Sequence, residues 1–289
     1  MHDAKVLSIE SAGKGNNPPQ CADTIYHGAT VVGLAELAKL LDVALQIPAG
    51  MTDIEFAVKR LRPGETLCRA GEEFESFYIV RSGFLKTVCV DGSGNEQVLG
   101  FPMRGDAIGV DGFDRGYYAA DAVALDSCHV IVLPFRRITT LAGRIPGLER
   151  LVYSIFNHEL VHKQNMVRLL GMLNAEARVA ALLLDLSERF GKLGCSKSAF
   201  ILRMSRQELG SYLGIKLETV SRALSAFAAL GLIDVNRREL VLNDVPALRR
   251  KIESRPAKEV ERPRSSRVPP LRPAIRLAPR GMAMSSMAA

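Results

Sequence analysis

The sequence predicts an α+β protein in which a β-roll is followed by a long helix and then by a winged helix-turn-helix. Three observations support this prediction. Short apolar runs between glycines occupy residues 55–144, a continuous 3/4-spaced helical pattern occupies 145–173, and two helices around a glycine turn precede two β runs within 174–250. Residues 1–54 form an N-terminal extension, and residues 251–289 form a basic, proline-rich tail predicted to be disordered.

The composition excludes several classes of protein. No segment approaches the roughly 18 to 20 continuous apolar residues of a membrane span, and the N-terminus lacks the regions of a signal peptide, so we expect a cytoplasmic protein without a membrane partner. The five cysteines form no CxxC pair, which disfavours a zinc site or a disulfide framework and favours reduced thiols. Most of the net charge of +7 lies in the tail, so the folded part must be judged by its local charge.

Short strands are predicted in the β region. The segments FYIV, FLKTVCV and EQVLGF have the apolar or alternating pattern of strands, and turn-forming glycines separate them. Regular short strands with turn residues between them are typical of an antiparallel barrel, roll or sandwich. Before these strands, the segment TVVGLAELAKLLDVAL has the pattern of a short helix.

The long helix is predicted to be apolar on two faces. One 3/4-spaced series consists of Leu148, Val152, Ile155, Met166, Leu169 and Leu173. The other series consists of Tyr153, Phe156, Leu160, Lys163, Val167 and Leu170. Because a helix with two apolar faces must be covered twice, we expect one face to pack on the β domain and the second series to form a homodimer interface. The alternative is a helix buried within a monomer.

The segment MSRQELGSYLGIKLETVSRALSAFAALGLI has the spacing of a helix-turn-helix. Ser205 and Glu208 match a capping box at the start of the first helix. Gly214 stands where the chain must turn sharply with positive φ, and the second helix is predicted to begin near Leu217. The buried face of that helix is predicted to consist of Val220, Leu224 and Phe227. The segment LIDVNRRELVLND then forms two β runs, as in a wing.

Polar residues at the start of the second helix have the chemistry of base recognition. In this motif that end enters the major groove of double-stranded DNA, where Arg pairs with guanine, Glu accepts from the cytosine amine, and Ser is adaptable. The outward side chains are Glu218, Ser221, Arg222 and Ser225. Phosphate contacts are expected from Arg206, Arg237 and Arg238. An ordinary surface ion pair between Glu218 and Arg222 is the alternative, but the capping box, glycine turn and wing favour DNA binding.

The order of these parts resembles the CRP/FNR family of bacterial transcription regulators over about residues 56–250. The strings that carry the resemblance are LRPGETLCRAGEEFESFYIVRSGFLKT, GDAIGVDGF, IPGLERL, NAEARVAALLLDLSERFG and ELGSYLGIKLETVSRAL. The resemblance implies that the β-roll is a jelly roll like those that bind cyclic nucleotides.

Cyclic-AMP readers of the family carry a Gly-Glu-Leu cassette followed by an Arg-Ser pair that clamps the cyclic phosphate. Here the matching positions are Gly109, Val110, Asp111, Ala120 and Asp121. Two carboxylates thus stand near the place of the cationic clamp, and they oppose a phosphodiester anion. The sequence therefore argues against cyclic AMP as the effector.

The recognition helix resembles that of FNR-type members. They share Glu218, Ser221 and Arg222 with this chain, whereas cyclic-AMP readers have Gly at the Ser221 position. The resemblance implies TTGAT-like half-sites read by a homodimer, with an apolar contact from Leu217 to a thymine methyl. It also implies that the loop VDGSGNEQV touches RNA polymerase, which favours activation over repression.

Two features depart from the FNR pattern. The iron–sulfur cluster of FNR needs four ligands, whereas this chain offers Cys21 in its N-terminal region and, near the β-roll position Ile131, only Cys128. We therefore expect no cluster and no cofactor. In addition, Lys163 stands where FNR-type proteins use an aspartate to couple dimerisation to the signal. We expect Lys163 to tune dimer affinity, with the partner's Glu159 relieving its charge.

Two other classes of function compete with this interpretation. A haem or small-metabolite sensor would use the β-roll as its ligand site. The histidines considered for haem are His27, His129, His158 and His162. An enzyme is the weakest alternative, because the sequence shows no nucleophile–base pair, phosphate loop or paired carboxylates at a useful spacing.

Overall fold

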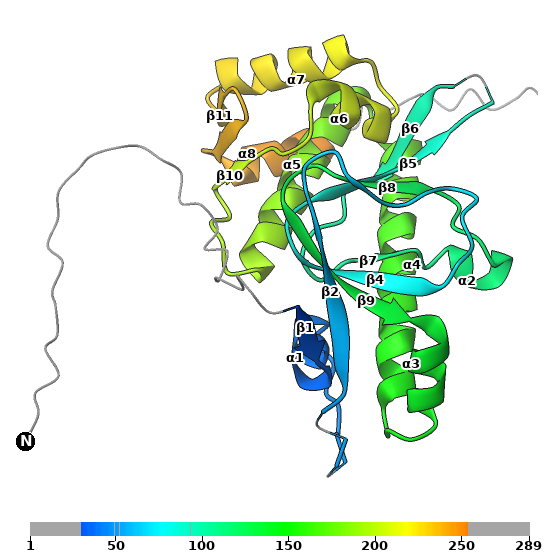
Figure 1. Cartoon of the computed structure of the whole chain (residues 1–289). Helices are drawn as coiled ribbons and strands as arrows, with labels where there is room; N and C mark the ends of the chain where they lie inside the picture. Colours follow the sequence, from blue (N-terminus) through cyan, green and yellow to red (C-terminus); the bar gives the residue numbers. More distant parts are fainter. Residues whose placement is uncertain (1–29, 49, 52, 93, 254–289) are drawn as a thin grey trace, which may run out of the picture. The chain divides into compact units, whose positions relative to one another are not determined.

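In a computed structural model the chain forms a β domain, a long helix and a helical domain with a small sheet (Figure 1). The structure describes residues 30–48, 50–51, 53–92 and 94–253. The first 29 residues, with Cys21 and His27, lie outside the described residues, and so does the tail from residue 254.

The β domain consists of two antiparallel sheets. The first has the order β1-β2-β9-β4-β7, with bounds Val31–Gly33, Glu55–Leu61, Cys128–Pro134, Ser76–Ser82 and Ala107–Ile108. The second has the order β3-β8-β5-β6, with bounds Thr66–Cys68, Asp121–Ala124, Leu85–Val90 and Glu96–Gly100. These sheets confirm the predicted β-roll, and the three predicted strand segments correspond to β4, β5 and β6.

Alternation along the strands gives the first sheet two buried faces. Val80 and Val130 point into the roll and belong to a cluster shared with the second sheet. Their neighbours Ile79 and Ile131 belong to another cluster on the opposite face. Successive side chains of a strand point to opposite faces, so this sheet must be covered twice.

Helices cover the outer face of the first sheet. They are α1 (Leu34–Leu40), α3 (Phe135–Ala142) and α4 (Leu148–Met172), while the short α2 (Gly112–Arg115) precedes β8. The predicted short helix is α1, and the strand β1 before it pairs with β2. Glu36 of α1 also bonds the buried Arg81 of β4 at 2.8 Å. Residues 31–41, placed in the N-terminal extension by the sequence, therefore pack as part of the β domain.

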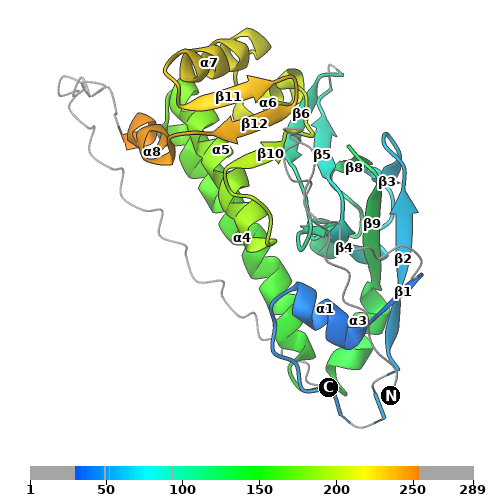
Figure 2. The same ribbon diagram turned by 90° about the vertical axis from the view of Figure 1, so that its left-hand side faces the viewer.

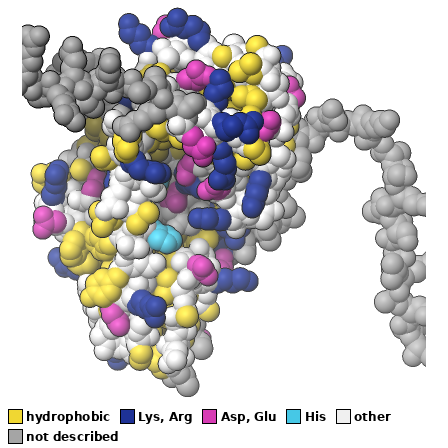
Figure 3. All heavy atoms as spheres, turned by 180° about the vertical axis from the view of Figure 1, so that it is seen from behind, with side chains coloured by type: hydrophobic (Ala, Val, Ile, Leu, Met, Phe, Trp, Pro, Cys, Tyr) yellow, Lys and Arg dark blue, Asp and Glu magenta, His cyan; other side chains and the backbone are white. Residues whose placement is uncertain are grey.

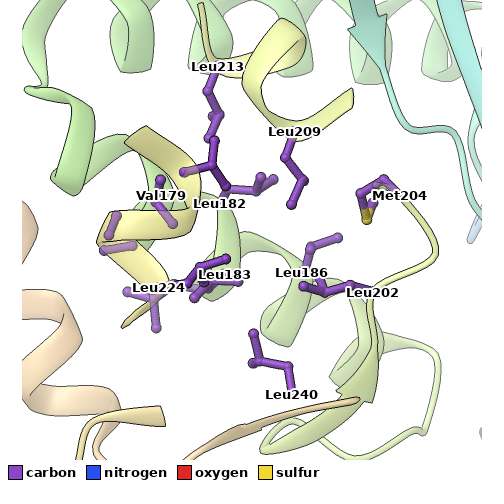
Figure 4. Close-up of a cluster of buried hydrophobic side chains, with 14 of the residues drawn as sticks. Val179, Leu182, Leu183, Leu186, Leu202, Met204, Leu209, Leu213, Leu224 and Leu240 are labelled. Carbon is purple, nitrogen blue, oxygen red and sulfur yellow. The ribbon is translucent and has the colours of Figure 1, made fainter. Parts of the chain in front are cut away.

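The helical domain is a winged helix-turn-helix. Its helices are α5 (Ala175–Lys192), α6 (Arg206–Leu213), α7 (Leu217–Ala229) and α8 (Val245–Glu253). Its sheet has the order β10-β12-β11, with bounds Ala199–Ile201, Glu239–Leu242 and Ile233–Asn236. Figure 4 shows leucines of α5, α6 and α7 pointing toward one another around this core. In Figure 2, α4 runs into α5 on the side away from β2.

Three of the four described cysteines are free thiols. Cys68, Cys89 and Cys128 are free, as expected. Cys195 is disulfide-bonded, so the expectation of reduced thiols is wrong for this residue.

Within the described ranges, no helix has the length and apolar character to cross a membrane. The same part of the chain contains no cluster of three or more His, Cys, Asp or Glu side chains that could bind a metal.

Two glycines shape the helix-turn-helix. Gly214 ends α6 in the left-handed region with φ of 63°, which confirms the predicted turn. At Gly210, a Cβ would lie 2.7 Å from the carbonyl oxygen of Ile215 and 3.3 Å from the amide nitrogen of Leu217. Glycine at 210 therefore allows α6 to lie against the start of α7.

We predict that Gly210→Ala lowers the stability of the protein by about 1 to 3 kcal/mol, because the added methyl overlaps backbone that cannot move independently. Thermal unfolding followed by circular dichroism measures the change. Gly171→Ala in α4 is the matched control, since a Cβ there meets no atom within 4 Å, and we expect it to be neutral or stabilising by up to about 1 kcal/mol. Equal melting temperatures for the two variants would contradict the close approach.

Candidate nucleic-acid interface

The start of α7 presents a polar face to solvent. Glu218, Arg222 and Ser225 are exposed, Ser221 is half-buried, and the apolar Leu217 is 42% exposed. The opposite face is buried, as predicted, by Val220, Leu224 and Phe227. The five residues selected from the sequence thus lie together on one accessible surface.

The charged groups of this face are not paired with each other. Nε of Arg222 donates to the main-chain carbonyl of Glu218 at 3.4 Å, and no ion pair joins the two side chains. The ion pair between Glu218 and Arg222, considered as the alternative to DNA binding, is therefore not formed, and Arg222 bonds to the backbone instead. Both charged ends point to solvent, where they are available to another molecule.

The first turn of α7 also lacks a side-chain cap. Its N-cap residue, Lys216, makes no capping hydrogen bond. By contrast, Ser205 and Glu208 form the complete capping box predicted for α6. The amide of Thr219 already donates to the carbonyl of Lys216 at 2.9 Å, so only the N–H groups before it are left without a cap, at an end of the helix that favours negative charge.

The three arginines expected to contact phosphate lie near one another. Arg237 and Arg238 are exposed in the turn between β11 and β12, and Arg237 has a left-handed φ of 54°. Nη2 of Arg206, at the start of α6, donates to the carbonyl of Arg237 at 3.4 Å. Burial lowers the pKa of Arg206, but a guanidinium stays charged at neutral pH. The wing and α6 therefore form one basic edge.

Arg178 of α5 was not selected from the sequence, yet it joins three elements. Its guanidinium donates to the carbonyls of Leu170 at 2.7 Å, Leu173 at 3.0 Å and Leu213 at 2.9 Å. The first two are carbonyls at the C-terminal end of α4, and the third ends α6. These bonds satisfy helix-end acceptors and fix the helix-turn-helix to the long helix. An arginine directly before the apolar string VAALLL was the available signal.

Lys86 and Glu208 form another connection that sequence reasoning missed. Nζ of Lys86 on β5 lies 3.0 Å from Oε1 of Glu208 on α6. Burial raises the pKa of Glu208, but bonds from Ser205 and the charge of Lys86 outweigh it, so the pKa lies below its usual value. The carboxylate is therefore ionised at neutral pH.

The second face of α4 is exposed at the positions expected to form an interface. Tyr153 is 68%, Leu160 57% and Val167 72% exposed. Phe156 is half-buried and packs edge-on against Phe77 of its own β domain, with ring centroids 5.8 Å apart. Figure 3, a view from behind, shows hydrophobic side chains gathered on the side where α4 lies.

The two remaining members of this series have local contacts. Lys163 pairs with Glu159 of its own helix at 3.1 Å, which is one turn away. The charge expected to be relieved by another copy is thus already compensated within α4. Leu170 is half-buried at the C-terminal end of the helix, where its carbonyl receives Arg178.

Asp121, at the second position of the pair compared with the clamp of cyclic-AMP readers, is used within the fold. Oδ1 of Asp121 accepts from the amide of Ala70 at 2.7 Å. Nearby, the hydroxyl of Tyr118 donates to the carbonyl of Ser76 at 2.9 Å, and Tyr78 lies beside it. Burial raises the pKa of Tyr78, so its phenol stays neutral. The carboxylate of Asp121 is thus bonded to a backbone amide of its own domain.

Among the described residues, His129, His158 and His162 belong to no cluster of three or more side chains that could bind a metal. His129 shares a hydrogen bond with Oγ of Ser82 through its Nδ1, at 3.1 Å. His158 and His162 lie on α4, the first exposed and the second half-buried. These positions offer no observation that favours haem over a surface or packing role.

Comparison with known domain families matches both halves of the chain. Residues 58–144 match the cyclic nucleotide-binding domain, and residues 177–251 match the Crp-like helix-turn-helix domain. These ranges correspond to the two-sheet roll and to the winged helix-turn-helix.

Full-length relatives match across both domains. The chain is 39% identical over 193 residues to the transcriptional regulatory protein btr of Bordetella pertussis, covering 67% of this chain and 80% of that protein. It is 36% identical over 190 residues to the fumarate and nitrate reduction regulatory protein of Escherichia coli K12, covering 66% and 76%. Among solved structures, FixK2 from Bradyrhizobium japonicum matches with a TM-score of 0.62 and 28% identity, over 68% of this chain and 96% of that one.

Replacing Arg178 by Met is expected to destabilise the protein by about 1 to 3 kcal/mol, because three carbonyls lose a charged donor. Urea unfolding measures the loss. Arg249→Met is the control: Arg249 pairs with Glu188 at 2.9 Å on an exposed surface, so its removal changes stability by no more than about 0.5 kcal/mol. A similar small change for both arginines would show that the three bonds contribute little.

The lowered pKa of Glu208 predicts a pH-dependent contribution to stability. The stabilisation by the carboxylate is complete above the ordinary glutamate pKa of about 4.3 and is lost as the pH falls through the lowered folded-state pKa. Wild type should therefore exceed Glu208→Gln in melting temperature at pH 7, and the difference should shrink in acid. A difference that stays constant down to pH 3 would contradict this assignment.

Proposed function

This chain belongs to the CRP/FNR family of bacterial transcription regulators, and we propose that it binds TTGAT-like palindromic sites as a homodimer and activates transcription. Family membership confirms the resemblance noted from the motifs. The protein is thus a DNA-binding transcription regulator whose relatives are regulators rather than enzymes. The exposed, uncommitted polar face of α7 carries the more specific proposal.

Base recognition is assigned to α7. Arg222 would pair with a guanine edge, Glu218 would accept from a cytosine amine, and Ser221 and Ser225 would make adaptable contacts. Leu217, exposed at the first position of the helix, would meet a thymine methyl. The position of these groups on one face, where only Ser221 is half-buried and the others are exposed, supports the assignment.

Phosphate contacts are assigned to the groups around this face. Arg206, Arg237 and Arg238 form a basic edge whose members come from α6 and the wing. The uncapped N–H groups of α7 add neutral donors. Such contacts position the protein without reading the sequence, and they make the affinity depend on salt.

Dimerisation is assigned to the exposed face of α4. Tyr153, Leu160 and Val167 are large apolar side chains more than half exposed on one helix. A second copy of α4 would cover them and place two recognition helices about a two-fold axis, as a palindromic site requires. Phe156, Lys163 and Leu170 would lie at the border of this interface. We propose that Lys163 still tunes the affinity, from within its ion pair with Glu159.

Cyclic AMP is an unsuitable effector for this β-roll. Asp121 stands at a position where cyclic-AMP readers clamp the phosphate, and its carboxylate is already bonded to Ala70. A phosphodiester there would meet a negative charge and no arginine.

Activation is assigned to the turn between β5 and β6. The exposed Val90 leads into this turn, and the amide of Gly94 donates to the carbonyl of Asp91 at 2.9 Å. A compact, exposed turn of this kind would offer RNA polymerase a defined surface. The family resemblance, which likens this loop to a polymerase-contacting one, supports activation over repression.

Binding to a TTGAT-N4-ATCAA duplex tests the DNA proposal. We expect Arg222→Ala to weaken binding by about 1 to 3 kcal/mol and to reduce discrimination at the guanine position. Arg237→Ala should weaken binding to all sequences and reduce the slope of log affinity against log salt concentration by about one. Arg249→Ala, remote from α7 on α8, serves as the control for loss of one positive charge. Undiminished guanine discrimination by Arg222→Ala would remove that residue from the reading set.

Sedimentation velocity tests the proposed dimer. Val167→Glu should dissociate it at concentrations where the wild type is dimeric, because two carboxylates would be buried near the two-fold axis. Asn165→Glu adds the same charge at an exposed position of the same helix, on a face turned away from Tyr153, Leu160 and Val167, and should leave the dimer intact. A dimer that survives Val167→Glu would place the interface elsewhere.

A further inference from the structure

The edge strand β6 binds the first helix of the helix-turn-helix. β6 lies at one edge of its sheet, so its outer N–H and C=O groups face no neighbouring strand. The hydroxyl of Ser211 on α6 accepts from the amide of Val98 at 2.8 Å and donates to the carbonyl of Glu96 at 3.1 Å. The side chain of Gln97 also donates to the main-chain carbonyl of Ser211. A helix thus satisfies a strand edge that would otherwise be open.

An ion pair lies one turn away on the same side of α6. Glu208 and Ser211 are three residues apart and therefore share a helix face. The Lys86 and Glu208 side chains are only 17% and 19% exposed, and their charged atoms are 3.0 Å apart. Oε1 of Glu208 faces Lys86, while Oε2 accepts the amide of Ser205 at 2.7 Å in the capping box. One carboxylate therefore serves both the helix cap and the contact with the β domain.

Apolar packing continues the same surface. The rings of Phe101 and Tyr212 have centroids 5.0 Å apart. Val88 and Val98 of the second sheet are buried in the cluster that contains the core of the helical domain.

Ion pairs of Asp106 with Arg189 and of Asp126 with Arg203 also join the two domains. An interface with a buried apolar layer and several ion pairs restricts relative motion of the two domains. The helix-turn-helix is thus held in one orientation.

We propose that Lys86 is a positioning residue for DNA binding, which acts through Glu208 to hold the helix-turn-helix against β6. The inference rests on the DNA-binding function proposed above. Glu218, Arg222 and Ser225 stay exposed while α6 is docked, so docking leaves the reading face open. A domain already held in orientation loses less freedom on binding. If the helix-turn-helix is not docked against β6 in some of the molecules, the apparent affinity for DNA falls in proportion to that fraction.

A double-mutant cycle in the full chain tests the proposal. Glu208→Gln removes the charge, while glutamine preserves the capping box, and Lys86→Met keeps the length of the side chain. Each variant should bind the palindromic duplex about fivefold more weakly. The double variant should be no weaker than either single variant, because the interaction is already lost. Lys86→Arg should restore wild-type affinity.

Hydrogen exchange supplies a readout that does not depend on DNA. The amide of Val98 donates to Ser211 of the other domain. Because Lys86 holds the two domains together in this proposal, Lys86→Met should make this amide exchange faster. Glu188→Gln is the matched control, since it removes the ion pair with Arg249 inside the helical domain and should change neither exchange nor affinity.

Lys86→Met binding DNA as tightly as wild type, or more tightly, would overturn the proposal. Unchanged exchange at Val98 would overturn it as well, because Lys86 would then not hold the docked state. If wild type does not bind the duplex while the Val98 amide exchanges faster in Lys86→Met, docking by Lys86 is supported and the proposed half-site is wrong.

Discussion

The apolar layer on the outer face of the second sheet is the interaction on which the DNA-binding half depends. Val88, Val98, Phe101 and Met103 are each at most 3% exposed and belong to the same cluster as the helical core. Burial of such side chains is the main favourable contribution to folding. The bonds of Ser211 lie at the margin of this layer, where the bond from the amide of Val98 is partly buried.

The first sheet imposes a second constraint, which determines what α4 can do. Its outer face needs α1, α3 and α4 as cover, and Ile155 of α4 is buried in that role. Phe156 is drawn to the same side by the rings of Phe77 and Phe113. Only the face that carries Tyr153, Leu160 and Val167 is then left for another molecule. Packing of one face of α4 thus defines the other.

The exposed polar face at the start of α7, which is proposed to contact bases, contributes little to the packing of the fold. Three polar side chains elsewhere are satisfied within the protein: Glu208 caps α6, Arg178 bonds three carbonyls, and Asp121 bonds a backbone amide. Glu218 and Arg222, by contrast, make only one weak contact with the backbone between them. α6 begins with a complete capping box, whereas α7 begins without a side-chain cap. Such departures from local sequence preferences are expected at functional sites.

Local patterns in the sequence determined the features that depend on near neighbours. The capping box of Ser205 and Glu208, the turn at Gly214 and the outward residues of α7 were predicted correctly because each involves residues within one or two turns. The order of roll, long helix and winged motif followed from the same periodicities. Periodicity identifies which face of an element is buried, but not what buries it.

Only the tertiary structure decided which distant residues meet. The bond from Val98 to Ser211 spans 113 residues, and the contact of Lys86 with Glu208 also joins separate domains. The packing of α1 on the β domain, the three bonds of Arg178 and the ion pair of Lys163 within its own helix have the same origin. Such partners depend on how whole elements are placed by the burial of their apolar faces. A pattern along one element contains no information about that placement.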